Sequence, residues 1–257
     1  MQYLVETALL THGLRSVSQE MLAAAWPFTD STLCWVEQGK IVRGTMAEYL
    51  PFREKNASLI RIDCYQLDTA LEQGLSGALT ASGTMEVCHR MGIPLAVSCG
   101  IGGIGDIKGE EVCPDLPALL QIPTALLATA PKDMLDIPAT IGWLLDHGVH
   151  VAGDRCTGYL FHSADVTLGE SLSDYPTAKE ITQAAQNGGL LLLQPMAERI
   201  EDDSILTHAI VEGKHAEAEG RYFHPAVNGE IDRLTQGRSS VMQLASLIEN
   251  VRLAASL

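Results

Sequence analysis

The feature that most constrains the fold is an alternation of short apolar runs with longer segments of helical periodicity. The apolar runs occupy residues 31–38, 93–100, 124–130, 150–155 and 189–195. Between them, residues 76–92 predict a small-residue turn followed by a helix that ends at Gly92, and residues 131–148 predict a helix that ends at Gly148. Strands that are separated by helices in this way form a mostly parallel sheet. We therefore predict an α/β protein, closed by an amphipathic helix over residues 239–257.

Length and composition indicate one globular domain. The chain has 257 residues, of which 46% are hydrophobic, and no linker, low-complexity tract or repeat divides it, so we predict a single domain over residues 1–257. Its net charge of −15, with only 17 Lys and Arg residues, argues against a nucleic-acid or membrane partner and favours a small-molecule substrate. The amino terminus lacks a basic n-region, and no apolar run has the roughly 18 residues of a membrane span. We expect a cytoplasmic protein.

The cysteines and histidines do not indicate a disulfide scaffold or a local metal site. The six cysteines are scattered, without a C-x-x-C pair, at Cys34, Cys64, Cys88, Cys99, Cys113 and Cys156. Such spacing predicts reduced and mostly buried thiols. The eight histidines form no H-x-x-x-H or H-E-x-x-H pattern, so a transition-metal site built from neighbouring histidines is not expected.

Glycines crowd residues 98–109, "SCGIGGIGDIKG", at the end of a predicted strand. The backbone there must turn sharply or approach another group closely, which fits either a ligand cradle at the carboxyl end of a parallel strand or an ordinary loop. No helix clearly begins directly after these glycines, which argues against a dinucleotide-binding turn.

A single lysine, Lys132, follows the next predicted strand, so it is expected at the same edge of the sheet as the glycines. A lysine in this position either extends to solvent or lies in an apolar pocket that disfavours the ammonium form, as an imine-forming nucleophile requires. The apolar residues "LLATAP" before it and "MLDIP" after it could supply such a pocket. Position alone leaves both interpretations open.

A family resemblance extends over nearly the whole chain. The segments "ETALLTHGL", "SGALTASGTM", "CGIGGI", "ATAPKDMLDIPATIGWLLDHGV" and "TQGRSSVMQLASLIENVRLAA" resemble successive landmarks of the pseudouridine-5′-phosphate glycosidase family, which includes the indigoidine synthase A-like proteins. The resemblance implies a three-layer α/β/α domain that assembles as a homotrimer. It also implies reversible cleavage of pseudouridine 5′-phosphate, or a related C-glycoside, to uracil and ribose 5-phosphate, with a divalent metal such as Mn²⁺ or Mg²⁺.

The resemblance assigns catalytic roles to Lys132 and Glu6. A C-glycoside has no leaving-group oxygen or nitrogen, so simple protonation cannot break its bond. If the sugar opens and its C1′ becomes an iminium on the Lys132 amine, the base can leave as a stabilised carbanion. By similarity, Glu6 in "VETALLTHG" is the acid and base that moves protons on and off the sugar oxygen and the base.

The resemblance also places substrate-binding and metal-binding residues. Thr80 and Ala81, in "SGALTASGTM", match substrate positions. The acidic loop "GEEVCPDLPAL" corresponds to the family's metal loop, in which Glu111 falls on the metal-ligand position. In that loop Glu110 and Asp115 are alternative ligands, since carboxylates suit magnesium and manganese. The substrate positions that follow Glu111 are Cys113, Pro114 and Asp115.

Some family positions carry different residues here. Ser58 stands where the family has a second lysine, although Arg61 and Asp63 of the following motif remain. Gln243 replaces an asparagine, and His162 replaces an arginine. These changes remove positively charged and polar groups that the family uses to bind an anionic substrate. Arg155 or Arg221 could compensate for the loss. Three hypotheses therefore stay open: a C-glycosidase of this family, a Schiff-base lyase acting on another sugar phosphate, and a non-catalytic ligand-binding relative.

Overall fold

The computed structural model describes residues 1–109 and 111–257 of the chain. The strands are β1 Tyr3–Val5, β2 Leu33–Glu37, β3 Lys40–Gly44, β4 Ile60–Ile62, β5 Gly77–Leu79, β6 Leu95–Val97, β7 Gly100–Ile101, β8 Ala125–Ala128, β9 Ala130–Pro131, β10 His150–Ala152, β11 Arg155–Cys156, β12 Val166–Thr167 and β13 Leu190–Leu193. The helices are α1 Gln19–Ala25, α2 Met46–Arg53, α3 Leu67–Glu72, α4 Ala81–Arg90, α5 Asp115–Gln121, α6 Ile137–Asp146, α7 Ala178–Asn187, α8 Asp203–Ala218, α9 Phe223–Leu234 and α10 Arg238–Ser256. Short helical turns occupy Leu9–Gly13, Asn56–Ser58 and Leu172–Asp174.

The strands form one large sheet in the order β10-β13-β8-β6-β1-β2-β5-β4, and β3 pairs with β2. All neighbours from β10 to β2 are parallel, while β2 runs antiparallel to β3 and β5. Beyond the ends of β6 and β8, β7 pairs with β9 in a separate parallel pair. β1 therefore lies in the middle of the sheet, and its carboxyl end points to the same edge as those of β6 and β8.

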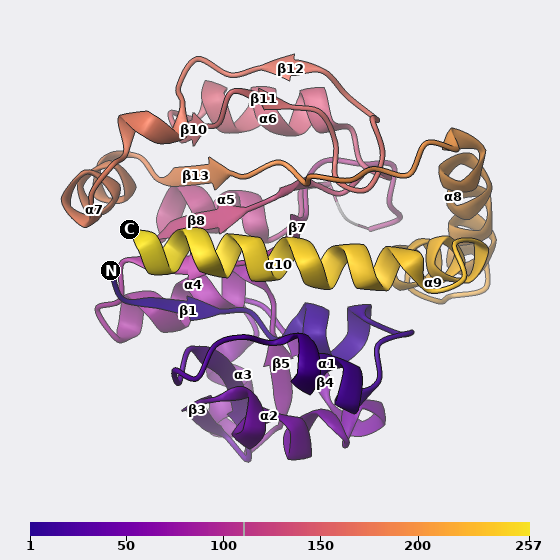
Figure 1. Cartoon of the computed structure of the whole chain (residues 1–257), viewed down its shortest axis with the longest axis horizontal. Coiled ribbons are helices and arrows are strands. Elements are labelled where there is room, and N and C mark those ends of the chain that lie inside the picture. Colours follow the sequence, from indigo (N-terminus) through magenta and orange to yellow (C-terminus); the bar gives the residue numbers. More distant parts are fainter. Residues whose placement is uncertain (110) are drawn as a thin grey trace.

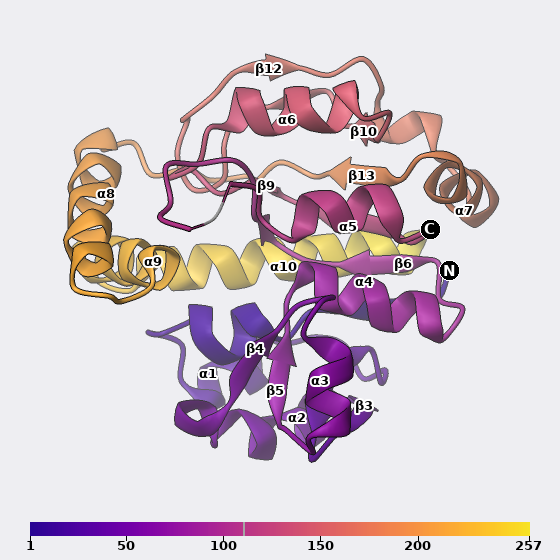
Figure 2. The ribbon, with the colours of Figure 1, turned by 180° about the vertical axis from the view of Figure 1, so that it is seen from behind.

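Helices cover both faces of this sheet. The helix α10 packs along one face against β1, β6 and β8, across the middle of Figure 1. The helix α4 packs against the same strands on the other face, which is turned to the viewer in Figure 2. The buried apolar side chains form one continuous core. The predicted α/β class, with three α/β/α layers and a mostly parallel sheet in a single domain, is confirmed.

All five predicted strands and the three predicted helices are present; the strands, α4 and α6 are shorter than predicted, and α10 is shifted by one residue. The helices α4 and α6 end two residues before Gly92 and Gly148, whose positive φ angles of 66° and 79° follow the last helical turn. One local prediction was wrong, because residues 77–79 of the expected turn form β5. This strand is only three residues long, and its sequence has no strand pattern. It is stabilised by pairing with β2 and β4.

The helices α8 and α9 form a hairpin that our sequence analysis did not identify. It lies at the end of the sheet toward which β1 and β13 point (Figure 1). The two helices approach closely at Gly213, where a Cβ atom would come within 2.4 Å of the Val227 side chain. In the part of the chain described, no helix combines the length and the apolarity needed to cross a bilayer.

Candidate active site

A cavity of about 1150 Å³ opens at the carboxyl edge of the sheet, where open α/β sheets bind ligands. Its walls include Glu6 after β1, Thr80 after β5, Gly100 and Gly102 after β6, and Lys132 after β9. We refer to this cavity as the cleft. The structure therefore brings Glu6, Lys132 and the glycine turn together around one cavity, as the site hypothesis requires.

Glu6 is a buried carboxyl group at the centre of the sheet edge. Its side chain is 6% exposed, and the Ser98 hydroxyl donates a hydrogen bond to Oε2 at 2.9 Å. Burial raises the pKa of Glu6 to about 7, although the Ser98 hydrogen bond and the positive charge of Lys132 oppose this shift. A carboxyl group that titrates near neutrality can both donate and accept a proton at working pH.

Lys132 is fixed by its backbone. Its N–H donates to the Ile101 carbonyl at 3.1 Å, and its own carbonyl accepts from the Leu135 N–H at 3.0 Å. The first of these bonds joins the lysine directly to the glycine turn. Among the described residues, no carboxylate forms a salt bridge with the half-buried Lys132 side chain. Its amine is therefore available to a ligand in the cleft.

In the glycine turn, Gly100–Gly103, the glycines are needed because side chains press against them, and not because their φ angles are positive. A Cβ atom at Gly100 would lie 2.7 Å from the Tyr159 ring, and one at Gly102 would lie 2.0 Å from the Cys113 sulfur. Gly103 would meet Thr140 Oγ1 at 2.5 Å. The sequence left open whether the glycines serve a sharp turn or a close approach to another group. Close approach applies at these positions, and the turn forms part of the cleft wall.

Each of the predicted substrate-binding residues lines the cleft: Thr80, Ala81, Cys113, Pro114 and Asp115. Thr80 caps α4, because its hydroxyl accepts a hydrogen bond from the Gly83 N–H. Asp115, only 7% exposed, accepts from the Ser82 N–H at 3.0 Å with Oδ1 and from the Gly102 N–H at 2.8 Å with Oδ2. One carboxylate thus ties the start of α4 and the glycine turn to the start of α5.

The carboxylates of the acidic loop do not fit a divalent-cation site built from several protein ligands. Glu111 is exposed and is not among the described residues that line the cleft. Both Asp115 oxygens already accept backbone hydrogen bonds, and Glu110 lies outside the described residues. Within the described ranges, no group of three or more His, Cys, Asp or Glu side chains could hold a metal. The manganese or magnesium site therefore stays a prediction.

Arg61 is one of four cations in the described cleft lining, together with Lys108, Lys132 and Arg221. Its half-buried guanidinium lies near Glu6, whose negative charge opposes the lowering of the Arg61 pKa by burial. His12 also lines the cleft, but burial and the Arg61 charge lower its pKa to about 4, so it is neutral at pH 7. Ser58 is exposed on the turn before β4 and is not among the described cleft residues. Arg61 therefore offers a half-buried positive charge to an anionic group in the cleft.

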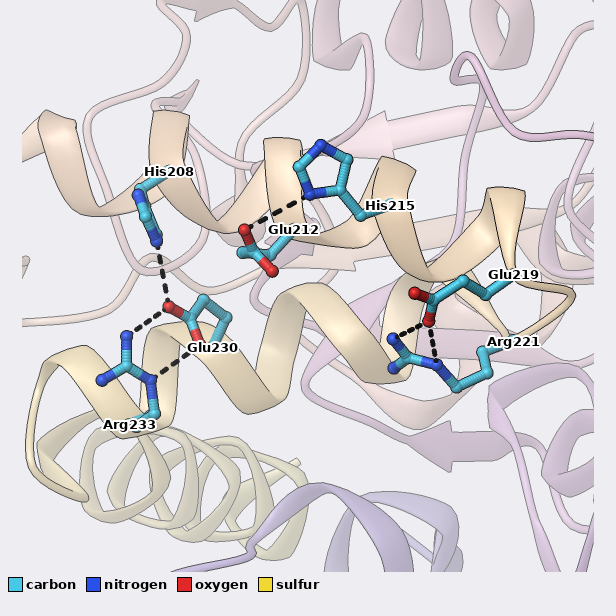
Figure 3. Close-up of polar contacts among 7 residues, drawn as sticks. All are labelled: His208, Glu212, His215, Glu219, Arg221, Glu230 and Arg233. Carbon is cyan, nitrogen blue, oxygen red and sulfur yellow. Dashed lines mark hydrogen bonds and ion pairs between the residues drawn. The ribbon is translucent and has the colours of Figure 1, made fainter.

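The α8–α9 hairpin and the segment that joins its helices form a second, more polar wall of the cleft. Arg221 and Tyr222 line this wall, and the Glu219 carboxylate binds Arg221 at 2.6 Å. Figure 3 shows this pair and further charged pairs along the same helices, such as Glu230 with Arg233 at 2.6 Å. Of the two arginines considered as replacements for the missing lysine, Arg221 is at the cleft. Arg155 is exposed, paired with Asp165, and absent from the described lining.

Sequence reasoning missed several cleft residues. Tyr159, from the loop after β11, is 2% exposed and lines the cleft, but nothing in its segment "TGYLFHS" distinguishes this tyrosine from a core residue. Ser98, which is fully buried behind the cleft and donates to Glu6, was seen only as part of the glycine-rich stretch. His162, which replaces a family arginine, is exposed and not among the described cleft residues. Gln243, noted only as a replaced family residue, is 3% exposed and lines the cleft from α10.

Comparison with known proteins identifies the group to which these residues belong. The family model described as "Indigoidine synthase A like protein" matches residues 6–257. The chain is 28% identical to a pseudouridine-5′-phosphate glycosidase from Methylobacterium nodulans, over 98% of this chain and 81% of the relative. It is 26% identical to a protein of the same name from Thermus thermophilus, over 98% and 94%. These relatives confirm the prediction of an enzyme.

Two solved structures have the same fold. An indigoidine synthase A-like protein from Thermotoga maritima matches with a TM-score of 0.79 at 23% identity, over 98% of this chain and 90% of that chain. The prealnumycin C-glycosynthase AlnA, solved in complex with ribulose 5-phosphate, matches with a TM-score of 0.77 at 24% identity, over 99% and 89%. Together with the family match over residues 6–257, the shared fold leads to one conclusion: this chain belongs to the indigoidine synthase A-like family.

Proposed function

We propose that the chain is a C-glycosidase that reversibly cleaves the carbon–carbon glycosidic bond of pseudouridine 5′-phosphate, or of a related C-glycoside, through a covalent intermediate on Lys132. The observation that carries the proposal is the presence, in one cleft, of a lysine amine and a buried carboxyl group whose pKa is raised to about 7. The names of the glycosidase relatives and of the C-glycosynthase support the same substrate class.

In the proposed first step, the Lys132 amine attacks C1′ of the sugar. A C–N bond forms while the bond from C1′ to the ring oxygen breaks, and Glu6 in its protonated form donates a proton to that oxygen. The lysine nitrogen then loses a proton. The Glu6 carboxylate, which has just given up its own proton, accepts it. The sugar is now open and attached to Lys132.

In the second step, the nitrogen lone pair forms a C=N bond as the bond from C1′ to the base breaks. The bonding electrons go to the base, which takes a proton and leaves as uracil. Water then hydrolyses the imine, which restores the Lys132 amine and releases the aldehyde form of ribose 5-phosphate. The overall reaction consumes one water, and Arg61 offers a half-buried positive charge to the phosphate.

Reductive trapping tests this proposal. The protein would be incubated with ribose 5-phosphate and uracil, or separately with other pentoses and bases, then treated with borohydride and analysed by peptide mass spectrometry. A pentose phosphate adduct on Lys132 is expected. Lys108 is a matched control because it is the other lysine among the described cleft residues, and Lys108→Arg should keep the adduct. An adduct that survives Lys132→Arg would contradict the proposal.

The sugar phosphate that the cleft accepts can be tested separately from the mechanism. Because Ser58 is exposed and does not replace the missing lysine, the cleft offers fewer cations than the resemblance implies. A Schiff-base lyase acting on another sugar phosphate would use the same two residues. Comparing adduct formation for ribose 5-phosphate and for unphosphorylated ribose would separate a phosphate requirement from a requirement for the pentose alone.

The divalent metal and the homotrimer also belong to this proposal. Calorimetric titration with Mn²⁺ should show binding that Glu111→Ala weakens, and light scattering should give three times the mass of one chain. Unchanged manganese affinity in Glu111→Ala would move the metal site elsewhere, and a monomeric mass would remove the trimer. Neither result would alter the assignment of Lys132 and Glu6.

A further inference from the structure

The ring of Tyr159 lines the cleft because neighbouring glycines leave room for it. Tyr159 comes from the loop after β11 and lines the same cavity as Glu6 and Lys132. A Cβ atom at Gly100 would lie 2.7 Å from its ring, so the glycine turn and the ring are in direct contact. At Gly158 the φ angle is 108°, and a Cβ atom there would meet the Phe161 carbonyl at 2.4 Å. Glycine is therefore required at position 100, against this ring, and at position 158, directly before Tyr159 in the chain.

A buried carboxylate holds the Tyr159 loop against the lysine segment. Asp133 directly follows Lys132 and is 7% exposed. Its Oδ1 accepts hydrogen bonds from the Tyr159 N–H at 2.7 Å and from the Ser163 hydroxyl at 2.6 Å, and its Oδ2 accepts from the Leu160 N–H at 2.7 Å. Burial raises the pKa of Asp133, and these donors oppose the shift by stabilising the carboxylate. The positions of Tyr159 and Lys132 are thus coupled through one side chain.

The Tyr159 hydroxyl reaches a second cleft residue. It lies 3.2 Å from Oε1 of Gln243 and 3.0 Å from the sulfur of Cys99. Burial raises the pKa of Tyr159 well above its usual value, so the phenol keeps its proton. The phenol is the donor in both contacts, and its single proton serves one acceptor at a time. Oε1 of Gln243 is the stronger of the two acceptors, because the Cys99 sulfur accepts weakly and its thiol itself donates to the Gln243 main-chain carbonyl at 3.4 Å. With Oε1 engaged in this way, the NH₂ end of the Gln243 amide is left for the cleft.

We propose that Tyr159 is a positioning residue, anchored by Asp133, which orients the Gln243 amide so that its NH₂ group donates a hydrogen bond to the substrate. The inference rests on the proposed function, because the acceptor is a substrate oxygen that gains negative charge as the bond to the base breaks. A donor fixed in advance is worth more at such an oxygen than one that must reorient during the reaction. Loss of the phenol should therefore affect kcat more than KM.

The experiment compares Tyr159→Phe, Gln243→Ala and the double variant with the wild type. Tyr159→Phe keeps the ring and removes one hydrogen bond, for which we expect a loss in kcat of about tenfold, with KM changed less than twofold. The borohydride adduct on Lys132 should still form. Because both residues act through one amide, the double variant should be no slower than Gln243→Ala alone.

Tyr49→Phe is a matched control. Tyr49 is also fully buried, and its hydroxyl bonds to Thr11 Oγ1 at 2.6 Å, but it is not among the described cleft residues. Its loss should lower the melting temperature and leave kcat of the folded protein unchanged. Wild-type kcat in Tyr159→Phe, or additive losses in the double variant, would overturn the inference.

The outcome for the proposed function can be read separately. If the wild type forms no adduct with any pentose, the proposed function fails. The contact between Tyr159 and Gln243 is then measured from the unfolding free energies of the same four proteins. Additive values would overturn the inference. Non-additive values, as expected for two residues joined by a buried hydrogen bond, would support Tyr159 as the residue that orients Gln243.

Discussion

The two walls of the cleft differ in burial and in how their charges are held. On the sheet wall, Glu6 and Asp115 are 6% and 7% exposed and accept hydrogen bonds from a buried hydroxyl or from the backbone. On the hairpin wall, Arg221 pairs with an exposed glutamate, and Tyr222 is 86% exposed. Burial changes the pKa of a side chain strongly, whereas exposed pairs are screened by water. The sheet wall is therefore suited to chemistry, and the hairpin wall to contact with the substrate.

The largest expected effect is at Lys132. Lys132→Arg keeps the positive charge but should reduce turnover by more than about a thousandfold, because a guanidinium stays protonated and cannot form the imine. Steady-state kinetics on an active substrate would measure this loss. The control on the hairpin wall is Arg221→Lys, which should remain within severalfold of the wild type. Wild-type turnover by Lys132→Arg would mean that the lysine only contributes charge.

The next largest effect is expected at Glu6. Glu6→Gln removes the proton donor and should lower kcat by about 100- to 10,000-fold, the range for general acid–base catalysis. The wild-type rate should also depend on an ionisation near pH 7, which Glu6→Gln should lose. A neutral inflection that persists in Glu6→Gln would assign the ionisation to another group.

The same substitution should change stability in a direction that the pKa predicts. Because the folded state binds the Glu6 proton more tightly than the unfolded state does, this group favours folding most at low pH, and its contribution is lost between about pH 4.5 and pH 7. Glu6→Gln should therefore gain stability relative to the wild type as the pH rises, by at most about 3 kcal/mol. Melting curves of both proteins at pH 5 and pH 8 would show it. A constant difference between them would indicate an unshifted carboxyl group.

A smaller effect is expected at Asp115. Asp115→Asn replaces one of two acceptor oxygens with an NH₂ group that faces a backbone N–H, which should lower the free energy of unfolding by about 1–3 kcal/mol. Denaturant titration would measure this change. Asp106→Asn is the control, because Asp106 is exposed and pairs only with Lys214 in the described part of the chain, and it should change stability by less than about 1 kcal/mol. Equal effects at both positions would remove the distinction between the two walls.

The smallest expected effect is on the hairpin wall. Arg221→Ala should raise KM severalfold without changing kcat, because the guanidinium is exposed and already paired with Glu219. Arg233→Ala removes the ion pair between an exposed arginine and the mostly buried Glu230 on the same hairpin, outside the described cleft residues, and should change neither constant. A large loss of kcat in Arg221→Ala would show that the hairpin wall takes part in the chemistry.

The sequence by itself determined the mostly parallel α/β fold and pointed to two residues of the candidate site. Buried strands and amphipathic helices leave periodic patterns within a short window, so β2, β6, β8, β10 and β13 and the helices at 81–90, 137–146 and 238–256 could be predicted locally. Glu6 and Lys132 were found because they lie in segments that resemble a known family. The three-residue strands β1, β4 and β5 were not found, since pairing with neighbours stabilises them more than their own residues do.

Only the tertiary structure decided which other side chains complete the cleft. Ser98 contacts Glu6 across 92 residues of sequence, and Tyr159 contacts Gln243 across 84. Such contacts depend on how strands and helices pack, and a hydroxyl or an amide carries no local signal of its distant partner. The same packing took Glu111 and Arg155 away from the described cleft lining, although their residue types suited the predicted roles. Residue type sets what a side chain can do, and the packing of distant segments sets whether it is in place to do it.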